Sequence, residues 1–325
     1  MGAYLLRRLL NYVILTFVGA SIAYLLAALA LNPKSNYEGK HPTPPPAVIT
    51  RMLDEKNLNP DTDVFVRYGH WLDDLAHGNF GTEVQGGSVG QDLARRVGVS
   101  TRLLLFATII GAIGGVLVGA WNAVRQYRAS DHLSALASFL IISTPVFTLA
   151  ILLKALAIWF NNASGTSFFQ YDNEYDLTTT AFWPQMLSRA QHLVLPTITL
   201  VLGEIAILSR YQRSTMLDVL GSDFLRTARA KGLTRRRAIY KHGLRTAIIP
   251  VMTLLVYNTV LLFTGATFTE TIFDWNGMGK WAVTSIQGND TNAVAAVSLF
   301  VAGLVLIAGL ISEIAYAALD PRVRA

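Results

Sequence analysis

Positive charge is concentrated in one segment of the chain, residues 210–245, between two apolar runs. The segment holds ten Lys and Arg against two Asp, a balance of +8, whereas the whole chain has a balance of only +6. Lysine and arginine in such a cluster bind carboxylates, phosphates or acidic surfaces. Three explanations are therefore open: a loop that is basic because it faces the cytoplasm, a docking element for a cytoplasmic protein, and a surface for anionic lipid.

The order of residues within this segment favours the docking element. Ser222 and Asp223 suit the start of a short helix, because a serine N-cap and a first-turn carboxylate stabilise the free amides there. Gly232 can end that helix in a left-handed conformation. Thr234 can then cap a second basic helix, Arg235–Arg245. A plain solvated loop does not need this succession of caps and a glycine turn.

A second set of polar residues lies inside apolar runs. Glu204 stands in the run that precedes the basic segment, and Tyr257 and Asn258 stand in the run that follows it. An ionisable residue in a membrane helix usually faces a cavity or a partner. Glu204 is therefore either part of a translocation path or half of a buried ion pair, and Tyr257 and Asn258 are further candidates for the path.

The residue patterns of catalysis are not found in the sequence. It contains no G-x-x-x-x-G-K-[ST] stretch and no H-E-x-x-H, and we predict no catalytic residues and no ATP site on this chain. It has no cysteine, and its six histidines lack a metal-ligand spacing, so no metal site and no bound cofactor are expected. The candidate functions are consequently binding and transport.

The elements that must position these residues are membrane helices. Apolar residues make up 52% of the chain and charged residues only 15%, and several uncharged runs have the roughly 20 residues that cross a bilayer. The sequence predicts an all-α polytopic membrane protein with six transmembrane helices. The predicted helices are Val13–Leu31, Leu103–Val124, Leu133–Phe160 with a bend at Pro145, Leu193–Ser209, Ala247–Phe268 and Ala293–Ala317.

Short basic segments set the expected orientation, with both termini in the cytoplasm. Residues 1–31 are predicted to hold the first membrane helix, residues 32–99 a small extracytoplasmic domain, residues 100–317 the core with helices 2–6, including a cytoplasmic coupling segment at 210–246, and residues 318–325 a cytoplasmic tail. Asn161–Gln191 is expected to form an outer loop. A short amphipathic helix, Gln91–Val97, is expected to lead into the second membrane helix.

Three glycines in the second membrane helix share one face. Gly111, Gly115 and Gly119 follow one another at intervals of four residues. Without side chains they permit a neighbouring helix to approach closely. We expect that neighbour to be another helix of this protein, in preference to a second copy of the chain.

A resemblance to a known family enters at residues 226–233, which read RTARAKGL, followed by Arg236-Arg237 and Lys241-His242-Gly243-Leu244-Arg245. This stretch resembles the coupling-loop signature of bacterial ABC importer permeases. It is most similar to the dipeptide and oligopeptide type, and to the first permease of the pair. The general signature has Glu-Ala-Ala where this chain has Arg226, Thr227 and Ala228, so a role that needs a glutamate at Arg226 is not expected.

The resemblance implies a type I importer transmembrane fold and a set of partners. These are a second homologous permease, a cytoplasmic ABC ATPase with two sites for ATP and Mg on one or two chains, an extracytoplasmic peptide-binding protein and the lipid bilayer, with no nucleic acid. The implied ATPase-coupling residues are Asp223, Phe224, Leu225, Arg226, Thr227, Ala228, Arg229, Ala230, Lys231, Gly232 and Leu233. The alternatives are an ion-coupled secondary carrier and ABC import of nickel, glutathione or a sugar.

Overall fold

The computed structural model describes residues 2–38, 42–176, 178 and 180–319; the described side chains exclude those of residues 2–8, 253, 256, 257, 259–261, 264 and 311–319. The chain forms two compact units, which are described in turn. The first unit comprises residues 1–101 and 276–307, and the second comprises residues 102–275 and 308–325. Two long helices, α4 (Val89–Val124) and α12 (Thr291–Leu319), contribute residues to both.

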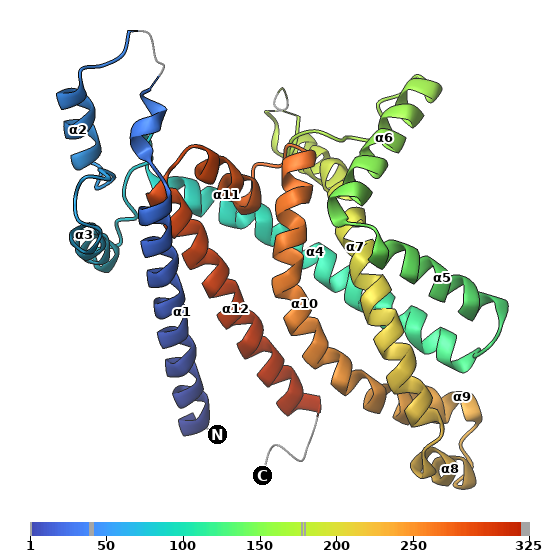
Figure 1. Ribbon diagram of the computed structural model, residues 1–325. Coiled ribbons are helices and arrows are strands. Elements are labelled where there is room, and N and C mark those ends of the chain that lie inside the picture. Colours follow the sequence, from blue (N-terminus) through green and yellow to red (C-terminus); the bar gives the residue numbers. More distant parts are fainter. Residues whose placement is uncertain (1, 39–41, 177, 179, 320–325) are drawn as a thin grey trace. The chain divides into compact units, whose positions relative to one another are not determined.

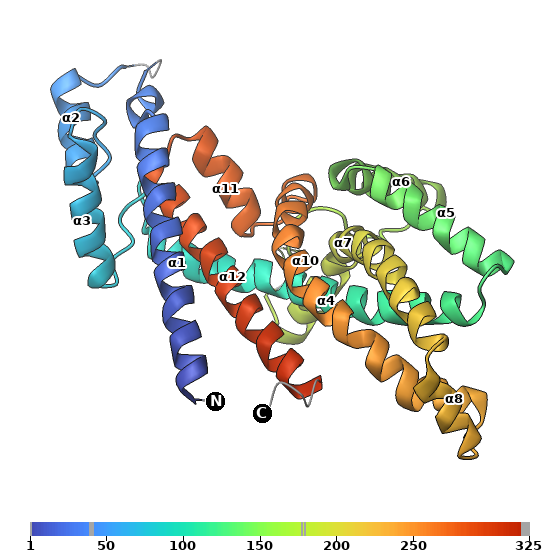
Figure 2. The same cartoon turned by 60° about the horizontal axis from the view of Figure 1, so that its bottom comes forward.

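The first unit contains the segment between the first two long helices. Its elements besides parts of α4 and α12 are α1 (Gly2–Ala30), the 3-10 turn η1 (Pro33–Asn36), α2 (Pro46–Asp54), α3 (Val64–Ala76) and α11 (Met278–Gln287). Helix α1 runs beside α12 in both views (Figures 1 and 2). Tyr24 of α1 stacks on Trp71 of α3 with 4.7 Å between ring centroids, and both side chains are buried. Ala295 of α12 completes this core, which joins α3, in the region between the first two membrane helices, to α1 and α12.

Helix α7 is the centre of the second unit. The elements around it are α5 (Ala129–Ser143), α6 (Val146–Ser164), α8 (Asp223–Ala230), α9 (Arg235–Ala238), the π-helical turn η2 (Ile239–Gly243) and α10 (Leu244–Ile272), while α7 itself spans Phe182–Leu220. It contacts α5, α6 and α10 along its length. Both views show α8 where α7 ends and α10 begins (Figures 1 and 2).

The predicted glycine face brings α4 against α7. A Cβ atom added at Gly111 would lie 2.5 Å from Cγ of Glu204, and one added at Gly119 would lie 2.4 Å from the carbonyl oxygen of Ser209. A Cβ atom at Gly115 would meet Leu208 at 2.6 Å. Such distances leave no room for a side chain, so the glycine stripe packs inside the protein, as predicted.

The third membrane helix was predicted as one bent helix, Leu133–Phe160, and this is wrong. Helix α5 ends at Ser143, and α6 begins at Val146. Thr144 and Pro145 are both extended between them, with ψ values of 123° and 142°. The proline ring clashes with a helical conformation of the preceding residue, so the chain breaks here instead of bending.

The fourth membrane helix was predicted to be short, Leu193–Ser209, but α7 has 39 residues. It takes up the end of the predicted outer loop Asn161–Gln191 and the start of the basic segment. The residues added at its two ends are polar on average but bury one face, including His192 and Gln212. An apolar run therefore shows only the middle of this helix.

Several helices are long enough to span a membrane. Among the described residues, five helices are long and apolar enough to cross a membrane: α1, α4, α6, α7 and α12. Helix α10 has 29 residues and occupies the position of the predicted fifth span, Ala247–Phe268. The predicted helix Gln91–Val97 is the first part of α4 and not a separate element.

Candidate coupling and translocation sites

Helix α8 begins where the sequence predicts, but its cap differs. Ser222 occupies the N-cap position in an extended conformation. Its hydroxyl makes no capping bond to the helix and donates instead to the carbonyl of Val219 at 2.5 Å. Asp223 lies in the first turn, where its charge suits the positive end of the helix, and pairs with Arg226 at 3.4 Å on the surface.

Gly232 ends this segment as predicted. Its φ is +90°, a value that glycine adopts without a steric penalty. The Gly232 amide donates to the carbonyl of Arg229 at 3.0 Å, and the Leu233 amide donates to the carbonyl of Ala228 at 3.3 Å. This pair of bonds is the Schellman arrangement, which satisfies the last carbonyls of a helix and reverses the chain sharply.

One side chain anchors α8 to the rest of the second unit. Leu225 is 4% exposed, and it contacts the position of Gly243 together with Val219 and Met216. Leu225 is the buried residue of α8, whereas Phe224 beside it is 43% exposed. The exposed remainder of the helix, with its cations and Phe224, is available to a partner.

The second basic helix of the prediction, Arg235–Arg245, is not a separate element. Thr234 caps α9 as predicted, because its hydroxyl oxygen accepts a hydrogen bond from the Arg237 amide at 3.3 Å. The four residues of α9 continue through the π-helical turn η2 into α10 without a break. Helix α9 is therefore continuous with the fifth membrane helix, whereas α8 is joined to it through the turn at Gly232 and packs through Leu225.

An ion pair next to this region was missed from the sequence. Asp131 of α5 accepts two hydrogen bonds from Arg213 of α7, at 2.6 Å to Nε and 2.8 Å to Nη2. A third bond, from the Tyr127 amide at 3.0 Å, completes the site. The hydrogen bonds from Arg213 hold the pKa of Asp131 below its usual range. The residues are 82 positions apart, and only the folded chain brings them together.

Buried polar side chains along α7 and α10 form the candidate path. Glu204 is 2% exposed, and its side chain packs on Gly111 of α4. Asn258 of α10 lies beside Glu204 and is 5% exposed. Neither Oε1 of Glu204 nor Nδ2 of Asn258 has a hydrogen-bond partner in the described part of the chain. The side chain of Tyr257 lies outside the described residues.

Gln212 belongs to the same side of the protein and was not predicted. It lies two turns beyond Glu204 on α7 and is 0% exposed, and within the described residues neither its amide nitrogen nor its amide oxygen has a partner. Its Cβ atom would lie 2.7 Å from a Cβ atom at Gly119. No ion pair among the described side chains includes Glu204, so the buried-pair explanation of this residue gains no support.

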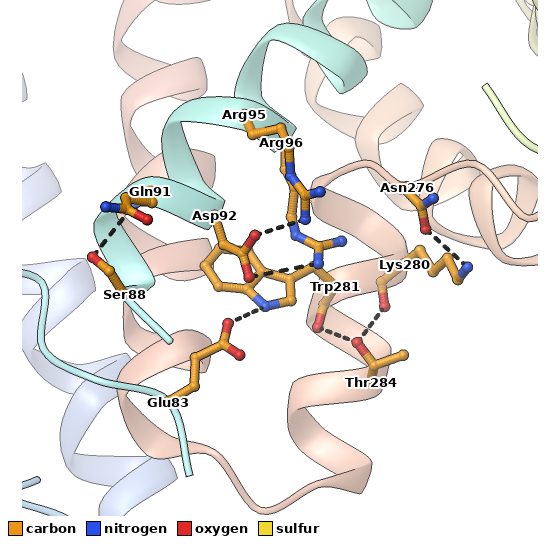
Figure 3. A network of polar contacts seen from close by, with 10 residues as sticks. All are labelled: Glu83, Ser88, Gln91, Asp92, Arg95, Arg96, Asn276, Lys280, Trp281 and Thr284. Carbon is orange, nitrogen blue, oxygen red and sulfur yellow. Dashed lines mark hydrogen bonds and ion pairs between the residues drawn. The ribbon is translucent and has the colours of Figure 1, made fainter. Parts of the chain in front are cut away.

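A different polar network lies in the first unit (Figure 3). Oε1 of Glu83 accepts a hydrogen bond from Nε1 of Trp281 at 3.0 Å, and the guanidinium of Arg96 lies 5.4 Å from the centroid of the Trp281 ring. Burial raises the pKa of Glu83, and the charges of Asp92 and Asp290 raise it further. The network ties the loop before α4 to α11, across 198 positions of sequence. In the part of the chain that the structure describes, no cluster of three or more His, Asp or Glu could hold a metal ion.

Comparisons with known proteins agree with this architecture. Residues 115–325 match the family described as binding-protein-dependent transport system inner membrane component. The oligopeptide transport system permease protein OppB of Mycobacterium tuberculosis (strain ATCC 25618 / H37Rv) is 48% identical over 325 residues, covering 100% of this chain and 99% of that protein. The dipeptide transport system permease protein DppB of Escherichia coli (strain K12) is 31% identical over 340 residues, with the same coverage.

A solved structure shares the fold. A chain of the MetNI methionine ABC transporter, in an inward facing conformation, superposes with a TM-score of 0.53 at 15% identity, covering 70% of this chain and 96% of that chain. At this identity the similarity concerns the fold alone. With the family match over most of the chain and relatives similar along its full length, this multi-pass membrane protein belongs to the family of binding-protein-dependent transport system inner membrane components.

Proposed function

We propose that this chain is a translocation subunit of an ATP-driven importer for peptides. The observation that carries the proposal is the similarity to OppB, which extends over the whole of both chains at 48% identity. DppB, a second relative similar along its full length, is also named for peptide transport. The names of these full-length relatives favour peptides over the alternative cargoes nickel, glutathione and sugars.

The proposed assembly contains three kinds of partner. A second homologous permease completes the membrane part, an extracytoplasmic peptide-binding protein delivers the cargo, and a cytoplasmic ABC ATPase, on one or two chains, binds ATP and Mg at two sites. In this arrangement α8 and both termini lie on the cytoplasmic side, as the basic segments favour. The chain itself has no P-loop sequence, so hydrolysis falls to the ATPase subunits.

Helix α8 is suited to transmit ATPase movement to the membrane helices. Its exposed surface offers the aromatic ring of Phe224 among cations, a composition that fits insertion into a groove of another protein. Leu225 packs at Gly243, which directly precedes α10, together with Met216 and Val219 of α7. Closure of the ATPases would therefore displace α7 and α10 as a rigid body and change the side of the membrane to which the path opens.

We propose that Glu204, Tyr257 and Asn258 line the translocation path. The support is the burial of Glu204 and Asn258 in membrane helices, where Oε1 of Glu204 and Nδ2 of Asn258 lack hydrogen-bond partners among the described residues. Uptake should fall when Glu204→Gln, Tyr257→Phe and Asn258→Leu are tested singly. Unchanged uptake and unchanged substrate-stimulated ATPase activity in all three variants would remove these residues from the path.

A pull-down of the detergent-solubilised chain tests the assembly. We expect an ATPase and a second permease to be recovered with it. Recovery of the chain alone, together with uptake that depends on an ion gradient and needs no ATP, would favour an ion-coupled carrier instead.

A matched pair of substitutions tests the coupling role of α8. Phe224→Ala removes an exposed aromatic side chain and leaves the Leu225 anchor in place, so the fold should persist while recovery of the ATPase and uptake both fall at least tenfold, as for an interface hot spot. Tyr127→Ala removes an aromatic ring that is 75% exposed in the loop before α5, and it serves as the control. Equal effects of the two substitutions would contradict a specific role for α8. Deletion of residues 224–232 should abolish uptake without preventing membrane insertion.

A further inference from the structure

A groove open to solvent lies on the segment that joins α8 to α10. It has a volume of about 550 Å³, within the range of roughly 300–1,000 Å³ found for small-molecule sites. Its walls are formed by Thr234, Arg236, Arg237, Tyr240 and Lys241. None of these residues belongs to α8 or to the residues 223–233 given an ATPase-coupling role, although Arg236, Arg237 and Lys241 stand in the stretch that carries the family resemblance.

The groove carries positive charge that nothing nearby neutralises. Arg236, Arg237 and Lys241 contribute three cations, and none of the ion pairs found among the described residues includes them. The acids in neighbouring ion pairs, Asp131 and Asp223, are held by arginines outside the groove. The groove is therefore complementary in charge to an anion.

The backbone beneath these cations is fixed. Ala238 and Ile239 lie between the two arginines and Tyr240 in sequence, and they are 1% and 7% exposed. Ile239 packs in a cluster with Met216 of α7 and Ala247 of α10. Burial of Ala238 and Ile239 keeps the flanking residues 236–237 and 240–241 on the outside, so the groove does not depend on the mobility of a loop.

The groove also lies near the level of a lipid head group. Lys241 precedes Ala247, the start of the predicted apolar run, by six residues, which corresponds to about 9 Å along a helix. Each head-group layer of a bilayer is roughly 5–8 Å thick, and lysine and arginine side chains extend toward it from either side. Tyr240 is 55% exposed here, as aromatic residues at membrane surfaces commonly are.

We propose that this groove binds the phosphate of an anionic lipid head group. The cations donate charge-assisted hydrogen bonds to the phosphate oxygens, and the Thr234 hydroxyl, which accepts from the Arg237 amide, has its own proton free to donate to the same group. The inference rests on the proposed function in one respect, the placement of α8 at the cytoplasmic leaflet, where anionic lipids attract basic segments. Bound lipid would keep the start of α10 at the depth of the head groups while α7, α8 and α10 move together.

Lipid retention by the full chain tests the proposal. The chain is reconstituted in bilayers of phosphatidylglycerol and phosphatidylcholine and released into detergent, and the bound lipids are counted by native mass spectrometry. The triple variant Arg236→Gln, Arg237→Gln, Lys241→Gln should retain phosphatidylglycerol roughly 100-fold more weakly, since each lost charge-assisted hydrogen bond to the phosphate lowers retention by at least about fivefold. Retention of phosphatidylcholine should not change.

A control variant removes the same charges from α8. Arg226→Gln, Arg229→Gln and Lys231→Gln take away two arginines and one lysine within a few residues of the groove, and phosphatidylglycerol retention should change less than threefold. Equal losses in the two triple variants would overturn the proposal in favour of diffuse attraction. Displacement of the lipid by inorganic phosphate at equal concentration would show a site for soluble anions, and this too would overturn it.

Failure of the lipid site can be distinguished from failure of the proposed importer function. Lipid retention needs neither ATP nor peptide, so it can fail while uptake and ATPase recovery remain intact, and only the lipid site would then be rejected. Retention could equally persist in a chain that recovers no ATPase. A groove variant that loses the ATPase but keeps its lipid would identify the groove as a protein interface and contradict the lipid site.

Discussion

Two groups of buried polar residues in this protein differ in their hydrogen bonding. Asp290, before α12, is 6% exposed, and its two carboxylate oxygens accept from the amides of Val84 at 2.7 Å and Ala293 at 3.0 Å. Asn292, two residues later, donates to two carbonyls at 3.1 Å each. Gln212 of α7 is buried more completely, yet neither end of its amide has a partner among the described residues.

Paired and unpaired buried groups have different roles: the paired ones stabilise the fold, and the unpaired ones favour a change of conformation. Paired groups such as Asp290 fix loops to a helix end, and an unpaired group would weaken the fold there by about 1–3 kcal/mol. Unpaired groups in α7 carry that cost in this conformation. We infer that Gln212 and Glu204 gain hydrogen-bond partners in another conformation or in the assembled importer. The hydrogen bonds gained there would stabilise that conformation relative to the present one.

The largest effect is expected from Asp290→Ala. This substitution leaves the amides of Val84 and Ala293 without acceptors in a buried site, so the free energy of unfolding should fall by about 3 kcal/mol. Asp63→Ala is the control, because Asp63 caps α3 through the Phe65 amide at 2.9 Å on the surface, and its loss should cost about 1 kcal/mol. Thermal unfolding in detergent measures both. An Asp290 variant as stable as the Asp63 variant would break the comparison.

The ionisation of Asp290 gives a second test, the pH dependence of unfolding. Burial raises the pKa of Asp290, so the folded protein holds this proton more tightly than the unfolded chain does. The stabilisation from protonated Asp290 is fully present below the pKa of this residue in the unfolded chain, about 3.9. It is lost as the pH rises through the higher pKa of Asp290 in the folded protein. Asp290→Asn should lack this dependence. A pH profile of unfolding that is identical in the wild-type protein and this variant would contradict the assignment.

Next in size is the effect of Arg213→Gln. It leaves Asp131, which is 4% exposed at its side chain, without its cation. Breaking a buried pair costs about 3–5 kcal/mol, and we expect about 2 kcal/mol because Arg213 is 31% exposed. The pKa of Asp131 is lowered, so its stabilisation is present above about pH 3.9 and is lost as pH falls through the folded pKa.

Unfolding between neutral and acidic pH distinguishes the variant from the wild-type protein. The wild-type protein should lose this part of its stability only at low pH, whereas Arg213→Gln should lack it already at pH 7. An unfolding temperature at pH 7 equal to that of the wild-type protein would show that α7 does not depend on its buried ion pair. The contrast with Gln212, one residue earlier on α7, would then disappear.

The sequence predicts much of the fold because apolar length and glycine spacing are local properties. The apolar runs give the membrane helices, Gly232 and Thr234 give the turn after α8, and the spacing of Gly111, Gly115 and Gly119 gives the close approach of α4. Where a helix continues past its apolar run, as α7 does at both ends, the run does not reveal it.

The candidate sites depend on contacts between distant residues, and these were only partly predictable. Glu204 was visible as a charge in an apolar run, but its contact with Gly111 joins two helices whose pairing no local pattern specifies. Asp131 and Arg213 each resemble ordinary loop or surface charges until the fold places them 2.6 Å apart. Gln212 lies in the basic segment, where a polar residue is expected to be exposed, yet it is buried and packs on Gly119 of α4.

The smallest effect is expected from Gln212→Met, and it tests the comparison most directly. Methionine is similar in length and flexible enough to fill the same space, but it has no amide to bury without partners. The free energy of unfolding should therefore rise by about 1 kcal/mol, because replacing an unsatisfied buried polar group removes its desolvation penalty. Peptide uptake should fall in the same variant if the amide finds its partners in another conformation. A loss of stability as large as that of Asp290→Ala would mean that Gln212 is already paired in the folded protein, and α7 would then be held in the same way as the loop before α12.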